Sequence, residues 1–491
     1  MRALWIAAAC MTMSLFGCAA GRSELAPSAP SVANYTAAPQ PRETSASVTP
    51  GGGAQHFRSA ESINGQWWKT FGAEPLNELV QQALDHSLTL TQARMKVIQA
   101  QQDYAAQAGG TTGPQTDAKL SGAREKVDPA AFGIPNIKQP QPFTLFNASV
   151  NVFYNLDLFG ANRRALESLA AQIDYQQFEL AAARATLAGN VVTTVIRRAS
   201  VAKQLELLER MVAAGAQQLA VTEHRVALGG VSLVELLGLR IQTQQTRAML
   251  SPLRQQMAQA DHQLAVYTGR EPGALMMGTT AGVRTIDQGA IDLDSLILPT
   301  DLPLTLPSAL AHQRPDIRAA EALLAQASAG VGVATANLYP QITLSGSAGS
   351  ERTSVADLLK GLNVWNAGLA LTQPLFHGGQ LHARKRSAEA AYQAALASYR
   401  QTVLQGLQQV ADALRALQHD ADELQARDEA ARAARENADI AQQRFDLGGI
   451  SRVDLLETQR QSLQATVDRT KVLAQRFADT AALYQALGAP P

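Results

Sequence analysis

Two segments of this chain, residues 165–228 and 384–447, each run for 64 residues without a proline. Apolar residues recur in them at steps of three and four, the spacing of one face of an α-helix. In the second segment this stripe consists of Tyr392, Leu396, Tyr399, Val403, Leu407, Val410, Leu414, Leu417 and Leu424. At 1.5 Å per residue, each helix would be about 96 Å long. Few globular domains need helices longer than about 25 residues, so the sequence predicts either a coiled-coil rod or a tube of helices.

The two long segments belong to two copies of one sequence pattern. RVALGGVSLVELL, which begins at Arg225, aligns with RFDLGGISRVDLL, which begins at Arg444, and 8 of the 13 positions are identical. At the same offset, Gly269 aligns with Gly488. A repeat of this kind has to be recognised before a fold is assigned, and it predicts an internal duplication.

Each copy is predicted to contain a helix, two strands, a long helix, a Gly-Gly turn and a return helix. The helices other than the long ones are expected over residues 75–108, 231–267, 305–338 and 450–487. Pro252 should kink the first return helix. The domain boundaries that follow are residues 61–270 for the first repeat, 271–304 for a linker or equatorial segment, and 305–491 for the second repeat.

The N-terminus has the pattern of an export signal. Arg2 precedes an apolar run that ends in Leu15-Phe16-Gly17-Cys18, which resembles the cleavage site of a bacterial lipoprotein. We expect a signal peptide over residues 1–17, a lipid such as palmitate on Cys18, and a disordered tether over 18–60, where Pro, Ser, Ala, Thr and Gly dominate. An ordinary signal peptide with an incidental Cys18 is the alternative. Ala19 is not the Asp that tends to retain lipoproteins in the inner membrane, which favours the outer membrane.

Composition and motifs exclude several classes of function. The 42 Lys and Arg residues are matched by 42 Asp and Glu residues, so no basic excess exists for a nucleic-acid partner. No internal stretch reaches the roughly 18 apolar residues of a membrane-spanning helix. Ser200 and Lys203 fit a Ser-x-x-Lys pattern, but they lie in the middle of a long helix without the companion motifs. No enzyme, catalytic residue, cofactor or metal site is predicted.

Four short segments alternate apolar and polar residues: 116–122, 143–156, 341–348 and 362–373. Such segments are typical of transmembrane β-barrels, although a half-buried soluble sheet gives the same alternation. The barrel is favoured because the chain offers no other apolar layer and carries an outer-membrane signal. Four strands cannot close a barrel, and lipid does not tolerate open strand edges.

The number of strands then predicts the number of chains. Two chains would supply eight strands, whose interior is filled by side chains, whereas three would supply twelve, enough for a polar lumen. The predicted fold class is an α+β membrane protein. It is a trimer with a 12-stranded transmembrane β-barrel, four strands per chain, continued by a 12-helix periplasmic α-barrel.

Several motifs resemble those of TolC-type outer-membrane efflux proteins, specifically the lipoprotein branch that serves tripartite RND pumps. They include WWKTFG from Trp67, DLFGANRR from Asp157, RPDIRAAE from Arg314 and ANLYP from Ala336. The resemblance covers about residues 63–488. It implies a homotrimer in contact with outer-membrane lipid, a periplasmic tunnel, and an equatorial belt. It also implies two partners, a periplasmic adaptor (membrane fusion) protein and an inner-membrane RND transporter.

The Leu-Gly-Gly turns are predicted to lie at the periplasmic tip, because each joins the far end of a long helix to a returning helix. Glycine allows the left-handed backbone of a tight hairpin, and a serine follows where an N-cap would start the return helix. The predicted tip residues are Gly229, Gly230, Ser232, Gly448, Gly449 and Ser451. The resemblance implies that these turns also dock the adaptor, and turn chemistry alone is the alternative.

The resemblance further implies that acidic residues near the tip line a periplasmic gate. Three chains would bring Asp454 into a ring, with Arg452 and Arg444 close enough to pair and hold the tip shut. The predicted gate residues are Asp454, Glu457, Glu235, Arg452 and Arg444. A solvated carboxylate that favours the helix N-terminus is the alternative.

The sequence therefore predicts a passive exit duct for drugs or other small toxic compounds, and so a component of multidrug resistance. The same architecture exporting metal ions or secreted polypeptide is one alternative. A lipid-anchored periplasmic coiled-coil protein without a pore is an alternative of another class.

Overall fold

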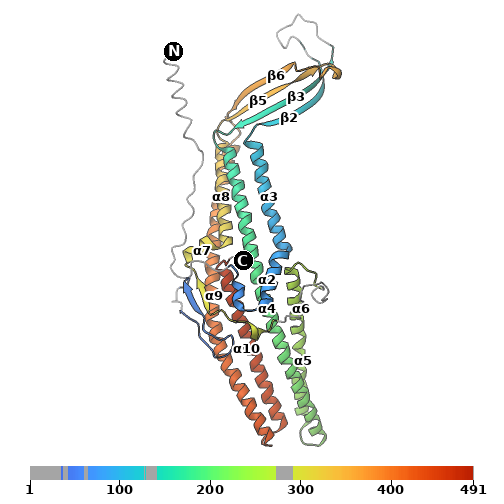
Figure 1. Ribbon diagram of the computed structural model, residues 1–491, viewed down its shortest axis with the longest axis vertical. Helices are drawn as coiled ribbons and strands as arrows, with labels where there is room; N and C mark the ends of the chain where they lie inside the picture. The colour runs from blue at the N-terminus through green and yellow to red at the C-terminus, as the bar shows by residue number, and fades with distance from the viewer. Residues whose placement is uncertain are drawn as a thin grey trace. The chain divides into compact units, whose positions relative to one another are not determined.

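The computed structural model describes residues 35–36, 42–59, 65–126, 128, 141–272 and 291–489. The predicted signal peptide, Cys18 and residues 273–290 of the predicted linker lie outside the described residues. Figure 1 labels most of the elements, which are, in chain order, β1 (His56–Ser59), η1 (Trp67–Phe71), α2 (Glu74–His86), α3 (Leu88–Thr111), β2 (Gln115–Glu125), β3 (Phe143–Leu156), α4 (Ala161–Ala227), α5 (Leu233–Ala248), α6 (Leu250–Tyr267), η4 (Leu293–Ser295), β4 (Asp301–Leu304), α7 (Pro307–Gln313), α8 (Pro315–Ala336), β5 (Gln341–Arg352), η5 (Val355–Asp357), β6 (Val364–Thr372), α9 (Gln380–Asp446) and α10 (Arg452–Ala486).

The chain divides into two compact units. The first draws its described residues from Val97–Gln176 and Ala320–Tyr399, and the second from Ser28–Lys96, Gln177–Ala319 and Arg400–Pro491. Both units contain parts of α3, α4, α8 and α9. No described helix combines the length and apolar character that crossing a bilayer requires.

The first unit contains a four-stranded antiparallel sheet in the order β2-β3-β5-β6, with β2 and β6 at its edges. All four predicted strands are confirmed. Residues that lie opposite each other in this sheet share a face. Val150 of β3 lies opposite both Ala118 of β2 and Ala348 of β5, and Ala348 lies opposite Trp365 of β6. The alternating patterns of the four strands are therefore in phase.

One face of the sheet is consequently mainly apolar and the other mainly polar, although Leu145 and Phe153 of β3 lie on the polar face. The apolar face carries Ala118, Leu120, Phe146, Ala148, Val150, Val152, Tyr154, Leu156, Ile342, Leu344, Ala348, Trp365, Ala367, Leu369 and Leu371. On the polar face, Ser149 donates to Asn147 Oδ1 at 2.9 Å, and Thr343 donates to Asn155 Oδ1 at 2.8 Å. Side chains on the polar face thus bond to one another both along and between strands.

The two long helices are confirmed and extend slightly beyond their predicted starts. α4 and α9 each comprise 67 residues, about 100 Å at 1.5 Å per residue. The predicted single first helix of each copy is wrong, because each is two helices. Ser87 separates α2 from α3 in an extended conformation, and Arg314 does the same between α7 and α8. Arg314 precedes Pro315, whose ring disfavours helical backbone at the preceding residue.

The return helices differ between the copies. α10 is continuous, as predicted, whereas the other return helix is broken at Met249 into α5 and α6. The predicted kink at Pro252 therefore lies three residues nearer the N-terminus. The reason is that a proline ring clashes with the carbonyl of the fourth residue before it, here Ala248, the last residue of α5.

The predicted tether is wrong for residues 42–59, which are folded into the second unit. β1 pairs in parallel with β4, so this stretch adds a strand to the segment before the second repeat. Gln55 is fully buried and donates to Pro299 O and Thr480 Oγ1, each at 3.0 Å. We refer to residues 42–59 as the strap. Its composition resembles a linker, but its polar groups find partners in α9 and α10.

The apolar core of the second unit lies where the strap, η1, α2, α4, α9 and α10 meet. Trp67, Trp68 and Phe71 of η1 are buried, and the Trp67 ring stacks on Tyr484 with centroids 5.1 Å apart. The aligned glycines Gly269 and Gly488 have φ angles of 70° and 72°. A Cβ on Gly269 would lie 2.4 Å from His86 O, and one on Gly488 would lie 2.8 Å from Arg314 Cγ. Each return helix therefore ends against the break between the first two helices of its own copy.

Candidate functional site

The hairpin between α4 and α5 turns on a single left-handed glycine. Gly229 has a φ of 72°, whereas Gly230 has no positive φ. The Gly230 N–H donates to Arg225 O at 2.8 Å, which satisfies a carbonyl at the end of α4. Ser232 then caps α5, because its side chain accepts from the Glu235 N–H at 3.2 Å. The predicted turn and N-cap are confirmed.

The hairpin between α9 and α10 has the same geometry with a more complete cap. Gly448 has a φ of 75°, and the Gly449 N–H donates to Arg444 O at 2.7 Å. The Ser451 hydroxyl accepts from the Asp454 N–H, and the Asp454 carboxylate accepts from the Ser451 N–H, each at 3.2 Å. This reciprocal arrangement is a capping box. The second turn is thus held more firmly than the first.

Asp454, the central residue of the predicted gate, uses its carboxylate within this cap. In addition to the Ser451 N–H, it accepts the Ser451 hydroxyl at 2.7 Å. Arg444 and Arg452 are exposed, and within the described chain neither forms an ion pair with Asp454. A single chain therefore shows the helix-cap role of Asp454, and its pairing with a neighbouring chain stays a prediction.

Glu457 has a partner that the sequence prediction missed. Its carboxylate receives two bonds from the Arg460 guanidinium, from Nη2 at 2.6 Å and from Nε at 2.9 Å. This bidentate bond, with a further bond from Gln461, lowers the pKa of Glu457 against the opposing effect of burial. The i,i+3 spacing of Glu457 and Arg460 on a helix was the signal available in the sequence.

The first tip differs from the second in the residues beyond its turn. Gly238 and Ile241 occupy the positions that align with Glu457 and Arg460. Leu233, Leu237 and Ile241 follow one face of α5 and are 60%, 44% and 60% exposed. The first return helix therefore presents apolar side chains near the positions of the ion pair in the second, and Glu235 is exposed on another face of α5.

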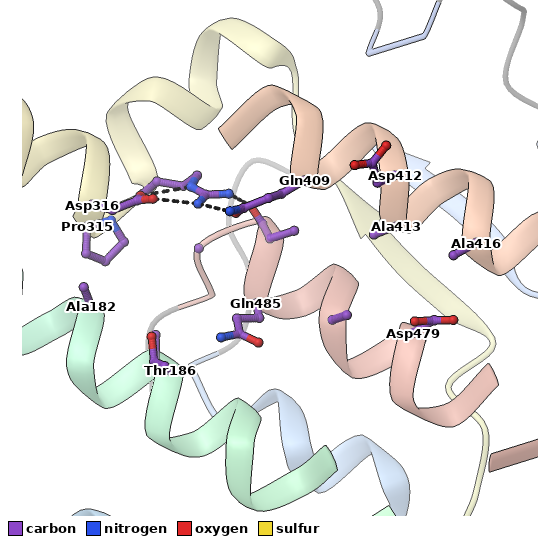
Figure 2. Close-up of a pocket in the computed structure, with 15 residues that line it drawn as sticks. Ala182, Thr186, Pro315, Asp316, Gln409, Asp412, Ala413, Ala416, Asp479 and Gln485 are labelled. Carbon is purple, nitrogen blue, oxygen red and sulfur yellow. Dashed lines mark hydrogen bonds and ion pairs between the residues drawn. The ribbon is translucent and has the colours of Figure 1, made fainter. Parts of the chain in front are cut away.

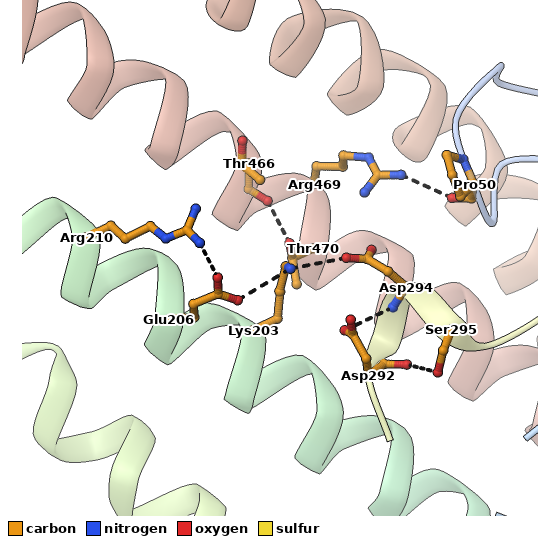
Figure 3. A network of polar contacts seen from close by, with 10 residues as sticks. All are labelled: Pro50, Lys203, Glu206, Arg210, Asp292, Asp294, Ser295, Thr466, Arg469 and Thr470. Atoms are coloured by element: carbon orange, nitrogen blue, oxygen red, sulfur yellow. Dashed lines mark hydrogen bonds and ion pairs between the residues drawn. The ribbon is translucent and has the colours of Figure 1, made fainter. Parts of the chain in front are cut away.

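A polar network fastens the segment before the second repeat to α4 (Figure 3). Lys203 bonds to Asp294 at 3.2 Å and to Glu206 at 3.4 Å. Burial alone would lower the pKa of Lys203, but Asp294 and Glu206 raise it above its ordinary value. The two ion pairs give Lys203 of the Ser-x-x-Lys pattern a structural role in holding this segment.

The strap is fastened by two buried charged residues of the α9–α10 hairpin. Arg476 is fully buried and donates to Gly53 O at 2.8 Å, to Thr44 Oγ1 at 3.0 Å and to Gln55 Oε1 at 3.3 Å. Asp428, 1% exposed, accepts from the hydroxyls of Ser47 and Thr49 and from Arg469. These hydrogen bonds lower its pKa although burial would raise it. Both charges thus serve to hold the strap.

The RPD motif of the second repeat borders a cavity of about 570 Å³ lined by residues of α4, α9, α10 and the α7–α8 break (Figure 2). Arg314 is buried and donates to Asp316 through Nε at 3.0 Å and Nη2 at 2.7 Å. It also donates to Gln409 Oε1 at 2.7 Å and to Ala486 O, at the end of α10, at 2.5 Å. The motif therefore ties three helical elements together, a role that the sequence prediction left unassigned.

Comparisons with known proteins agree with this arrangement. The chain is 29% identical over 433 residues to the pyoverdine export outer membrane protein OpmQ of Pseudomonas aeruginosa, covering 88% of each chain. It is 28% identical over 445 residues to the outer membrane protein OprJ of the same species, covering 89% of this chain and 88% of OprJ. The crystal structure of the Campylobacter jejuni CmeC outer membrane channel has the same fold. It matches with a TM-score of 0.80 at 21% identity, over 96% of this chain and 95% of CmeC.

The family described as outer membrane efflux protein matches residues 79–270 and 306–489, each containing one of the two helical hairpins and their Leu-Gly-Gly turns. These two matches cover most of the chain and correspond closely to the two predicted repeats. The chain belongs to the outer membrane efflux protein family.

Proposed function

We propose that three copies of this chain form a passive duct across the outer membrane and periplasm, as the outer-membrane component of a tripartite efflux pump. The sheet of the first unit carries this proposal. It has one apolar face, one polar face and two free edges, β2 and β6. In lipid such edges must be paired, and closure by two further copies would give a 12-stranded barrel with a polar interior.

The helices fit the same assembly. Each copy of the repeat provides one long helix and a set of shorter helices, so that an internal duplication supplies two equivalent walls per chain. Three chains would then form a 12-helix periplasmic α-barrel. The strap and residues 291–304, joined through β1 and β4, form part of an equatorial belt in this assembly.

Export of small molecules is the cargo assignment that the relatives support best. OpmQ is named for the export of pyoverdine, and the family is described by efflux. We propose drugs or other small toxic compounds as cargo, delivered by an inner-membrane RND transporter and a periplasmic adaptor. The adaptor would dock on the tips of the two hairpins, at Gly229, Gly230, Ser232, Gly448, Gly449 and Ser451. A lipid on Cys18 would anchor each chain to the outer membrane.

Reconstitution tests the duct directly. Full-length protein purified from outer membranes should migrate as a heat-modifiable trimer and conduct ions in planar bilayers. In cells that lack their own outer-membrane component, it should restore resistance only together with its adaptor and transporter. A protein that fractionates with outer membranes but never conducts would instead support the coiled-coil spacer without a pore.

The proposed gate can be tested at the second tip. The gate is proposed to consist of Asp454, Glu457, Glu235, Arg452 and Arg444. The double substitution Asp454→Ala and Glu457→Ala removes two carboxylates from each chain, so it should loosen the constriction and raise single-channel conductance. Asp439→Ala, an exposed carboxylate on α9 away from the turn, is the matched control. Equal conductance in all three proteins would contradict the gate assignment while leaving the duct in place.

A further inference from the structure

One pair of positions between the helices carries carboxyl groups in the second hairpin and apolar side chains in the first. The offset that aligns the Leu-Gly-Gly turns also aligns Val201 of α4 with Asp420 of α9, and Ala260 of α6 with Asp479 of α10. Val201 and Ala260 are buried apolar residues. The second hairpin therefore has two carboxyl groups where the first has two buried apolar residues.

The Arg469–Asp428 ion pair and the bond from Gln459 to Gln442 fix the antiparallel register of α9 and α10. This register places Asp420 opposite Asp479, and the two carboxyl groups interact through a side-chain hydrogen bond. Asp420 is partly buried, and its buried Oδ2 receives no bond from a donor in the described part of the chain. Asp479 borders the cavity of Figure 2 and accepts from Gln475 Nε2 at 2.9 Å. A proton on one carboxyl would supply the missing donor and join α9 to α10.

The neighbouring charges do not replace that proton. Arg476 is the nearby cation on α10, and its charge lowers the pKa of Asp420, but its guanidinium donates to Thr44, Gly53 and Gln55 of the strap. Glu423, on α9, adds a further negative charge. On the cavity side, α9 adds the carboxylate of Asp412, the Arg314–Asp316 pair belongs to the α7–α8 break, and α4 contributes only uncharged residues.

Elementary electrostatics then favours a shared proton. Two carboxylates in contact repel each other strongly away from bulk water, and the usual result is that one of them stays protonated. Burial, followed by the bond to Asp479 and its charge, raises the pKa of Asp420 to about 8. The pair is therefore singly protonated at neutral pH and loses its proton in mild alkali.

We infer that Asp420 and Asp479 share one proton and form a pH-dependent latch between α9 and α10, which opens when both carboxyls ionise. The latch lies 28 residues before Gly448, about 42 Å along α9 from the turn at the tip. If the proposed function holds, alkali loosens the hairpin that carries the gate. The latch itself rests only on the contact between the two helices.

The sign of the pH dependence follows from the raised pKa. The folded chain binds a proton that the unfolded chain releases near the ordinary value of 3.8, so the stabilisation is complete below that pH. It is lost progressively as the pH rises and is gone above about 8. Asp428 and Glu457, whose pKa values are lowered, act in the opposite direction, below pH 4.5.

The first hairpin supplies the test variant. Asp420→Val with Asp479→Ala installs the residues found at the aligned positions, and Asp420→Asn preserves a neutral hydrogen-bond donor. Asp439→Asn changes an exposed carboxylate of the same helix and is the control. The full-length protein in detergent is compared by infrared spectroscopy and by thermal unfolding between about pH 6 and pH 9.

We expect the wild type and Asp439→Asn to show the carbonyl band of a protonated carboxyl group near neutral pH, to lose it by about pH 9, and to lose thermal stability in parallel. The double variant Asp420→Val with Asp479→Ala and the single variant Asp420→Asn should both lack this band. Each should show at most half of the pH-dependent shift in unfolding temperature that the wild type shows. A wild type without such a band, or pair variants with an undiminished shift, would overturn the latch. Neither measurement depends on transport. The latch can therefore be confirmed or contradicted even if the proposed export function is wrong.

Discussion

Arg314 shows how a single side chain can fix the geometry of several helices. Its guanidinium reaches Asp316, Gln409 and the backbone carbonyl of Ala486 from a site that is 5% exposed. The planar fork of an arginine allows this set of bonds, whereas the ammonium of a lysine is a point donor on a flexible stem. The motif is recognisable in the sequence, but its three partners come from helices up to 172 residues away.

Arg314→Lys is therefore expected to destabilise the protein although it preserves the charge. Loss of the bond to Ala486 leaves a buried carbonyl unpaired, which costs about 1–3 kcal/mol, whereas the exposed Gln409 can bond to water instead. The change should appear as a lower midpoint of urea or thermal unfolding. Arg400→Lys, at an exposed position of α9, should change the midpoint little. Equal effects of the two substitutions would contradict the clamping role.

At the scale of elements, the sequence was most informative where the signals are local. The long helices, all four strands, both turns and the serine caps follow from proline placement, periodicity and glycine pairs. The separation of α2 from α3 at Ser87 has no comparable marker, because neither proline nor glycine lies there. Periodicity alone could not locate that break.

The strap escaped the sequence prediction for a different reason. Its small polar residues have the composition of a tether. Composition cannot reveal that the guanidinium of Arg476 donates hydrogen bonds to the strap, including one to Gly53, which lies 423 residues away in the sequence. Likewise, Glu457 was recognised as a gate candidate, but the spacing of Glu457 and Arg460 was not weighed against it. The strap depends on long-range partners, which a single sequence does not encode in any local pattern, whereas the Glu457–Arg460 pair has a local signal in its i,i+3 spacing.

The hairpin turns yield a prediction that separates two adjacent glycines. Only Gly448 has a left-handed backbone, with a φ of 75°, and an alanine there should cost about 1 kcal/mol. Gly449 has no positive φ, and its added Cβ would meet only Arg444 O at 3.3 Å. Gly448→Ala should therefore lower the thermal midpoint and speed amide exchange at the tip more than Gly449→Ala. The reverse order would show that the turn depends on close packing instead of backbone conformation.

At the scale of the whole molecule, the proposed trimer requires that other copies of the chain complete the sheet. Its edges β2 and β6 are separated by two strands, and at about 4.8 Å per strand they lie about 14 Å apart within one chain. A disulfide requires Cα atoms within about 7 Å. Cysteines placed on these two edges therefore cannot join within one sheet, so any bond between them must link two chains.

This geometry gives a direct test of trimer closure. Lys119→Cys on β2 is combined in turn with cysteine at Asn366, Gly368, Ala370 or Thr372 of β6, all on the polar face of the sheet. One of these combinations should give a covalent species of three chains on a denaturing gel after mild oxidation. Lys119→Cys with Ser149→Cys, which lie directly opposite each other in one chain, is the control and should leave single chains. In a closed barrel, both edges of every sheet are crosslinked, so the product contains three chains and no more. An open assembly would instead leave uncrosslinked ends and give a ladder of sizes.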